Sequence, residues 1–139
     1  MLKKTITFTD FNGVERTEDF YFNFTEAELA DMNLSVKGGM RAMLEKIINT
    51  QDIPEIARIF KDIIFKAYGE KSADGRRFIK SRELSEAFSQ TEAYSILYME
   101  LATDSKAASA FVNGVIPNRL INKAENNGAL IEGGLAKTE

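Results

Sequence analysis

The side chains that carry most enzymatic chemistry are missing from this chain of 139 residues, which contains no histidine and no cysteine. Their absence removes the commonest general base, the thiol nucleophile and the usual ligands of transition metals. Carboxylates remain, and two pairs lie three residues apart, Glu15 with Glu18 and Glu83 with Glu86. Such a pair can serve as general acid and base or cleave a glycosidic bond. Because acidic residues fill 21 positions, pairs of this kind arise by chance, and we interpret both as solvated surface.

Two glycine-containing segments are the remaining candidates for a ligand site. Gly38-Gly39 lacks the lysine and threonine of a phosphate-binding loop, and Asp74-Gly75 lacks the series of acidic residues that forms a calcium loop. We therefore expect no catalytic residue, no bound cofactor and no metal ion, and we expect that the protein is not an enzyme.

Residues that favour binding to another protein are easier to find. Arg76 and Arg77, with Lys71 and Lys80 close in sequence, form a basic cluster that could meet an acidic partner, although a solvated loop explains it as well. Three tyrosines complete the candidate set. Tyr94 and Tyr98 lie one helical turn apart and suit either an interface or core packing, and the strand period directs Tyr21 away from the core.

Composition describes a small, mildly acidic protein. The net charge of −3 comes from 18 basic and 21 acidic residues spread along the chain, which argues against a general phosphate-binding surface, so we expect no nucleic-acid partner. Without cysteine there is no disulfide framework. No apolar segment follows the two lysines of MLKKTITFTD, and no stretch approaches the length of a membrane span. We expect a soluble protein made in the cytoplasm, with no membrane contact.

The N-terminal residues 2–24 predict an antiparallel β-hairpin. Apolar residues fill even positions in both arms, and a three-residue loop, Phe11-Asn12-Gly13, places all of them on one face with Leu2 opposite Phe22. Asp10 then opens a type I turn and Gly13 supplies a left-handed residue. A lone hairpin is marginal in water, so its aromatic face must pack on the helices that follow, or else serve as a binding edge. An unpaired edge over Lys3–Thr9 would allow strand addition by a partner.

Residues 25–125 predict a body of about five to six short helices. Thr25 with Glu28 is a capping box, and the most secure helix begins near Pro54 and ends at Tyr68-Gly69, where glycine suits the left-handed residue after a helix. Other helices are predicted at about 35–50, after Ser81, after Thr91, after Thr103 or Asp104 up to Asn113-Gly114 and Pro117, and at about 118–125, with a short extended piece at 77–79.

The fold class is therefore α+β and mainly α, with an N-terminal antiparallel hairpin on a compact helical bundle. We expect one domain over residues 1–125 and a flexible tail over residues 126–139, where the sequence turns to Asn, Gly, Ala and Lys.

Several motifs resemble one family. They are TFTDFNGVERTEDFYFNFTEAELADM, LSVKGG, IFKDIIFKAYGEKSADGRRFIKS, FSQTEAYSILYMELATD and AFVNGVIP, and together they span roughly residues 3–117. This pattern is similar to that of the tail assembly chaperones of long-tailed bacteriophages. The resemblance implies a protein of the host cytoplasm that binds the tape-measure protein, keeps it soluble, helps to recruit tail tube subunits and is not retained in the virion. It leaves a homo-oligomer open and implies no particular functional residue.

Two other functions remain compatible with the sequence. The protein could be a structural tail or neck component of the virion, present there at fixed stoichiometry. It could also bind a host factor or be sensed by host defence. Since each of these acts by contact, residue types alone do not separate them.

Overall fold

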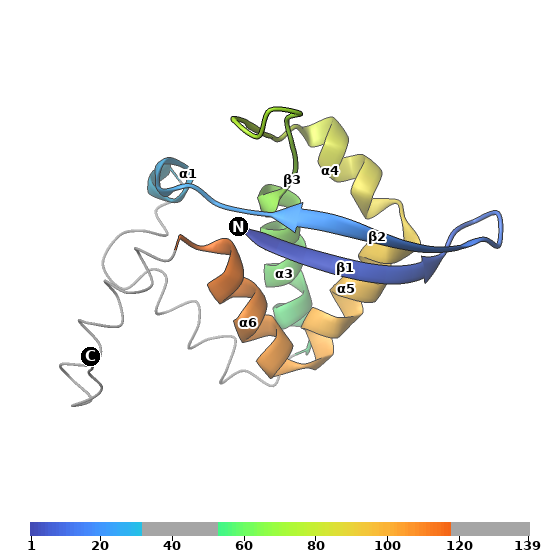
Figure 1. Cartoon of the computed structure of the whole chain (residues 1–139). Coiled ribbons are helices and arrows are strands. Elements are labelled where there is room, and N and C mark those ends of the chain that lie inside the picture. The colour runs from blue at the N-terminus through green and yellow to red at the C-terminus, as the bar shows by residue number, and fades with distance from the viewer. Residues whose placement is uncertain (32–52, 118–139) are drawn as a thin grey trace, which may run out of the picture.

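The computed structural model describes residues 1–31 and 53–117, which form a sheet with helices packed on one face (Figure 1). The sheet is antiparallel and its strands follow the order β1-β2-β3-β4. The elements are β1 (Leu2–Thr9), β2 (Glu15–Phe22), α1 (Glu26–Asp31), α3 (Ile53–Ala67), β3 (Tyr68–Lys71), β4 (Phe78–Ile79), α4 (Arg82–Ser89), α5 (Glu92–Thr103) and α6 (Ser105–Val115). The predicted α+β, mainly helical class is confirmed.

The hairpin of β1 and β2 has the predicted register, with Leu2 opposite Phe22 and Thr9 opposite Glu15. Its turn also follows the prediction. The Gly13 N–H donates to the Asp10 carbonyl at 2.9 Å, and Gly13 has a φ of 81°. One Asp10 carboxylate oxygen accepts the N–H groups of Asn12 and Val14, each at 2.9 Å. The side chain of Asp10 thus fixes the loop length on which the register depends.

The two faces of the hairpin differ as the alternation requires. Even-numbered side chains such as Ile6 and Phe22 are buried against the helices. The outer face is polar: the Thr5 hydroxyl donates to Asp19 at 2.6 Å, and the Thr7 and Thr17 hydroxyls lie 2.9 Å apart. The aromatic face is therefore core, as predicted, and the opposite face of these two strands is exposed to water.

The long helix ends where predicted, at Ala67 directly before Tyr68-Gly69, but the predicted left-handed glycine after it is wrong. Tyr68 does follow the last helical residue, but it begins β3, which pairs with β2 through Tyr21 opposite Gly69 and Phe22 opposite Tyr68. Gly69 has no positive φ. A Cβ there would lie 2.7 Å from a Phe78 ring carbon and 2.8 Å from the Ile79 carbonyl oxygen, so glycine allows β4 to approach closely. β4 corresponds to the predicted extended piece at 77–79.

The helix starts agree with the predicted caps. At α1, the Glu28 side chain accepts the Thr25 N–H at 2.8 Å and the Thr25 hydroxyl oxygen accepts the Glu28 N–H at 3.1 Å, which is the predicted capping box. Ser81, Thr91 and Asp104 cap α4, α5 and α6. The end of α6 differs from the prediction, because Asn113 and Gly114 lie inside this helix, which runs to Val115. Gly114 is the residue that packs against Leu2.

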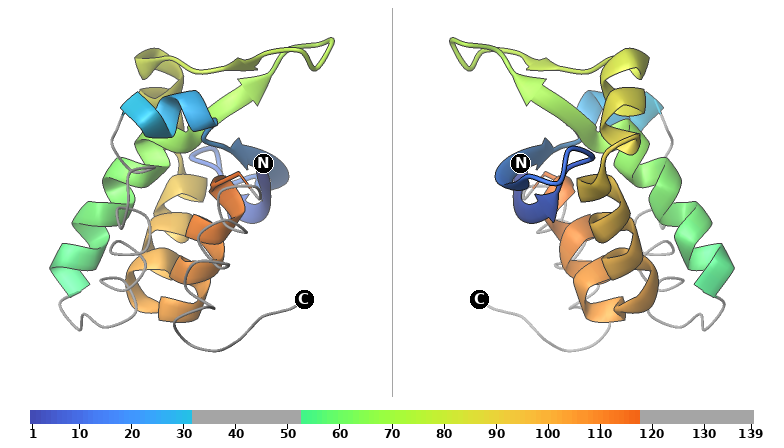
Figure 2. Two further views of the ribbon diagram at one scale, coloured as in Figure 1. Left: turned by 90° about the vertical axis from the view of Figure 1, so that its left-hand side faces the viewer. Right: turned by 90° about the vertical axis from the view of Figure 1, so that its right-hand side faces the viewer.

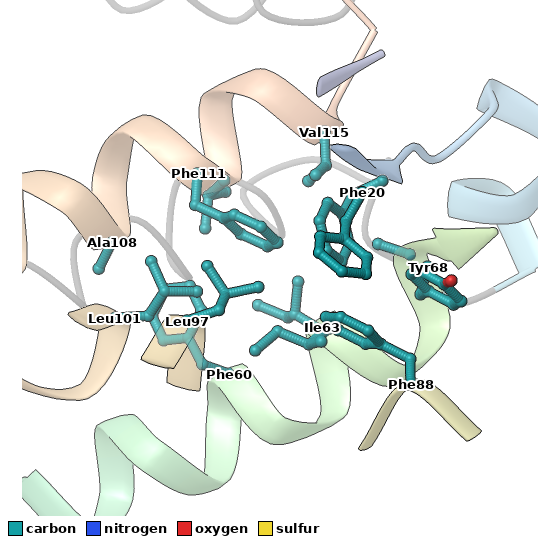
Figure 3. Close-up of a cluster of buried hydrophobic side chains, with 14 of the residues drawn as sticks. Phe20, Phe60, Ile63, Tyr68, Phe88, Leu97, Leu101, Ala108, Phe111 and Val115 are labelled. Carbon is teal, nitrogen blue, oxygen red and sulfur yellow. The ribbon is translucent and has the colours of Figure 1, made fainter. Parts of the chain in front are cut away.

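One core joins the hairpin to the helices (Figure 3). Phe22 and Phe60 both contact the ring of Phe111, with centroid distances of 5.2 and 6.1 Å, so α6 bridges the hairpin and the isoleucine-rich stripe of α3. Tyr68 stacks on Phe88 at 4.4 Å. The predicted packing of the hairpin's aromatic face on the helices is confirmed.

Backbone hydrogen bonds tie the chain after β2 to the ends of two helices. The Asn23 N–H donates to the Ala67 carbonyl and the Phe24 N–H to the Val115 carbonyl, each at 2.9 Å. The buried Ser85 hydroxyl donates to the Phe65 carbonyl at 2.7 Å. Carbonyl groups in the last turns of α3 and α6 therefore find partners outside their helices.

Three predictions lie outside the described residues: the helix at about 35–50, the helical piece at about 118–125 and the flexible tail over 126–139. The assignment of residues 1–125 to a single domain stays a prediction.

Candidate partner-binding site

The turn between β3 and β4 is held in one conformation by its own side chains. The Ser72 hydroxyl donates to an Asp74 carboxylate oxygen at 2.7 Å, and the same oxygen accepts the Arg76 N–H at 3.0 Å. The Arg77 N–H donates to the Ser72 hydroxyl at 3.0 Å, and Gly75 takes a φ of 74°. The Arg76 N–H, then the Ser72 hydroxyl, lower the pKa of Asp74, so its carboxylate stays ionised while it orders the turn.

This ordered turn projects from the body of the molecule (Figure 2) and carries both candidate arginines. Arg76 and Arg77 are exposed, and neither forms an ion pair within the described part of the chain. Because the turn is already ordered, two guanidinium groups could bind carboxylates without the entropic cost of fixing a mobile loop. We refer to residues 72–77 as the arginine turn.

The rest of the predicted basic cluster is divided between two roles. The Lys71 ammonium lies 4.6 Å above the centre of the Tyr21 ring, at the base of the arginine turn. Tyr21 is half-buried on the sheet beside Gly69, so the structure places this predicted residue next to the basic segment. A cation over an aromatic face is weakly stabilised and remains partly exposed. Tyr21 and Lys71 are therefore positioned to extend the surface of the arginine turn.

Lys80, in contrast, has a structural role. Its buried ammonium nitrogen lies 2.9 Å from a Glu28 carboxylate oxygen and 4.8 Å from the centre of the Phe24 ring. Partial burial raises the pKa of Glu28, but the Thr25 N–H and the Lys80 ammonium outweigh it, so the net pKa is lowered. Sequence reasoning missed this link between β4 and α1, because it grouped Lys80 with the arginines.

Tyr94 and Tyr98 stack on each other along α5, with ring centroids 5.7 Å apart. Tyr94 also meets the ring of Phe88 edge-on at 5.7 Å and packs against the core. Burial, then the neighbouring Tyr98, raises the pKa of Tyr94. Both rings are half-buried, which leaves Tyr98 at the margin of the core.

All four residues of the two acidic pairs are exposed. Glu15 and Glu18 lie on opposite faces of β2, since they occupy odd and even positions of one strand. Glu86 forms an ion pair with Arg82 at 2.8 Å, and Glu83 is exposed. Among the residues that the structure describes, no group of three or more His, Cys, Asp or Glu side chains is placed to hold a metal ion.

The described elements thus form an α+β fold with a polar outer sheet face and a projecting basic turn. The family model of phage tail assembly chaperones matches residues 1–138, and the chain belongs to that family. This match confirms the resemblance seen in the sequence motifs. Comparison with curated proteins gave no match, and neither did comparison with solved structures.

Within residues 1–31 and 53–117, none of the helices has both the length and the apolar character required to span a bilayer.

Proposed function

We propose that this phage tail assembly chaperone binds the tape-measure protein in the host cytoplasm, keeps it soluble and helps to recruit tail tube subunits. It leaves before the tail is complete. The observation that carries this proposal is the family match, which spans residues 1–138. The family is defined by tail assembly, and the finer assignment of tape-measure and tube partners is ours.

Two features of the chain support action by contact and not by catalysis. The sequence has no histidine or cysteine, and its two acidic pairs lie on exposed surface. Conversely, the arginine turn presents charged groups that the fold itself does not use. We therefore propose that the protein is not an enzyme and that Arg76 and Arg77 contact carboxylates of the client.

The client experiment is coexpression. The tape-measure protein is produced with and without this chaperone, and the soluble fraction of each culture is compared. We expect the tape-measure protein to be soluble only with the chaperone, and to be recovered with it on an affinity column. A tape-measure protein that stays insoluble, or is equally soluble alone, contradicts the proposal.

Purified phage particles provide a second test. A chaperone is abundant in infected cells and absent from finished particles. Detection of the chain at fixed stoichiometry in mature particles by mass spectrometry would instead favour a structural tail or neck component. Recovery of a specific partner from uninfected host lysate would favour the function in which a host factor is bound.

A further inference from the structure

The outer edge of the sheet is unpaired within the described residues. β1 ends the strand order, and its only strand partner there is β2. The Asp10 N–H donates to the Val14 carbonyl at 2.8 Å, which marks that pair as hydrogen-bonded. Because bonded and non-bonded pairs alternate in an antiparallel ladder, the even residues of β1 bond to β2. The N–H and C=O groups of Lys3, Thr5, Thr7 and Thr9 therefore point outward.

Side-chain contacts agree with this assignment. Side chains lie closest in non-hydrogen-bonded pairs, and the two side-chain bonds between the strands join Thr5 to Asp19 at 2.6 Å and Thr7 to Thr17 at 2.9 Å. All four outward-bonding residues of β1 are exposed. An exposed strand edge of this length is a template for another strand.

Two large apolar side chains are exposed on the helix that packs beneath this edge. α5 packs beneath β1, and the Lys4 ammonium reaches Glu100 of α5 at 3.4 Å. Ile96 lies one turn before Glu100 on α5. Met99 follows Ile96 by three residues, so the two side chains are neighbours on the side of the helix that faces away from the core. Both are large and exposed, Ile96 by 46% and Met99 by 53%.

The charges of the hairpin indicate which occupant fits. Lys3 lies near the open end of the hairpin and Glu15 near its turn. Neither forms an ion pair within the described part of the chain, whereas Asp10 is already paired with Arg16 at 2.6 Å. An antiparallel copy of the same hairpin would bring the basic end of each copy to the acidic end of the other.

We propose that two copies of this chain associate through antiparallel pairing of β1 with β1, centred on Ile6. In this register Lys3 lies opposite Thr9 and Lys4 opposite Phe8, so no two lysines face each other. Thr9 already pairs with Glu15, so Glu15 lies on the same face as Lys3 of the other copy, with β1 between them. The α5 helices of the two copies then lie beneath the joined sheet, one on each side of the two-fold axis. The proposal is independent of the client.

The decisive measurement is the mass of the full-length protein in solution by light scattering and sedimentation equilibrium. We expect a concentration-dependent dimer. Lys3→Glu and Glu15→Lys should each weaken dimerisation by about tenfold, because the two-fold axis repeats the lost pair. The double variant should recover most of that loss. Arg58→Glu is the control for Lys3→Glu, because it makes the same charge change on an exposed residue of α3. It should have little effect on dimerisation.

Proline variants test the backbone bonds. Thr7→Pro removes an outward N–H without removing a bond to β2, and proline is tolerated at a sheet edge. Thr17→Pro is the matched control, since its N–H also makes no bond to β1 and lies on the far side of β2. Circular dichroism checks that both variants fold. We expect Thr7→Pro to be monomeric and Thr17→Pro dimeric.

Three outcomes would overturn the proposal. One is a monomer at every concentration up to about 100 µM, well above the range of a specific dimer. Another is a dimer that folded Thr7→Pro leaves intact. The third is a double charge variant that is no tighter than either single one, because antiparallel pairing requires the reversed charges to attract.

Discussion

Two glycines of the sheet are needed for different physical reasons, and single substitutions separate them. Gly13 has a φ of 81°, and nothing lies within 4 Å of the position that a Cβ would take there, so glycine is required by conformation alone. Gly69 has an ordinary strand conformation, but a Cβ would collide with the Phe78 ring and the Ile79 carbonyl oxygen. The first position needs a left-handed residue and the second needs the absence of a side chain.

We predict that Gly69→Ala lowers the free energy of unfolding by about 1–3 kcal/mol, since overpacking forces the neighbouring strand to move. Gly13→Asn should cost well under about 1 kcal/mol, because asparagine tolerates the left-handed region. Urea unfolding of the two variants measures both values. If the two variants lose the same free energy of unfolding, the close approach of β4 does not require glycine at position 69.

The pair formed by Lys80 and Glu28 leads to a prediction of pH dependence. The pKa of Glu28 is lowered in the folded protein, so this carboxylate stabilises the fold above its ordinary pKa of 4.5. That contribution is lost as the pH falls through the lowered value. Glu28→Gln keeps an acceptor for the cap but removes the charge. We predict a loss of about 1 kcal/mol at pH 7, which shrinks as the pH falls below 4.5 and through the lowered pKa of Glu28.

The control for Glu28 is the same substitution in a Lys80→Met background. Methionine retains an apolar chain over Phe24 and removes the ammonium, so Glu28→Gln should cost less there. Unfolding curves at several pH values give all four stabilities. If the cost of Glu28→Gln is unchanged by Lys80→Met, or constant with pH, the ion pair does not stabilise the fold.

At the scale of elements, the start of α6 decides between two residues that the sequence left open. Asp104 accepts the N–H groups of Lys106 and Ala107 at 3.0 and 3.2 Å, whereas the Thr103 hydroxyl donates back to the Met99 carbonyl at 2.7 Å. We predict that Asp104→Ala costs about 0.5–2 kcal/mol and Thr103→Ala less than about 0.5 kcal/mol in thermal unfolding. The reverse order would assign the cap to Thr103.

Local signals explain which elements were predictable. The hairpin register follows from the period of its apolar residues together with Asp10 and Gly13, all within one short segment. The helix starts follow from capping residues that act on the next turn. β3 has no such signal within its four residues YGEK, which form a strand by pairing with Tyr21 and Phe22, far away in sequence, and with Phe78 and Ile79 of β4. Gly69 was therefore interpreted as a left-handed residue after the helix, whereas it belongs to a strand.

The candidate site shows the same limit. Composition identified the basic residues near the Asp74-Gly75 turn, and the structure places Arg76 and Arg77 at that exposed turn. The sequence could not show that Lys80 pairs with Glu28 or that Lys71 lies over Tyr21, since those partners come from distant elements. Which charges are used inside the fold, and which are left for a partner, depends on tertiary contacts.

At the scale of the whole molecule, a basic turn projects from an acidic chain. The net charge is −3, while Arg76 and Arg77 are exposed at the arginine turn without partners among the described residues. An acidic client segment would be repelled by much of the chain and attracted at this turn. Such an arrangement favours one orientation of encounter and makes the association rate sensitive to salt.

We therefore predict that the double variant Arg76→Glu and Arg77→Glu binds the tape-measure protein at least about tenfold more weakly at low salt. Surface plasmon resonance over a range of ionic strengths should show wild-type association slowing as salt screens the turn, and a much flatter response for the variant. Arg58→Glu with Lys61→Glu is the matched control, because it changes the net charge equally on exposed residues of α3. If both double variants weaken binding to the same extent, net charge and not the arginine turn governs recognition, and the client contact lies elsewhere on the molecule.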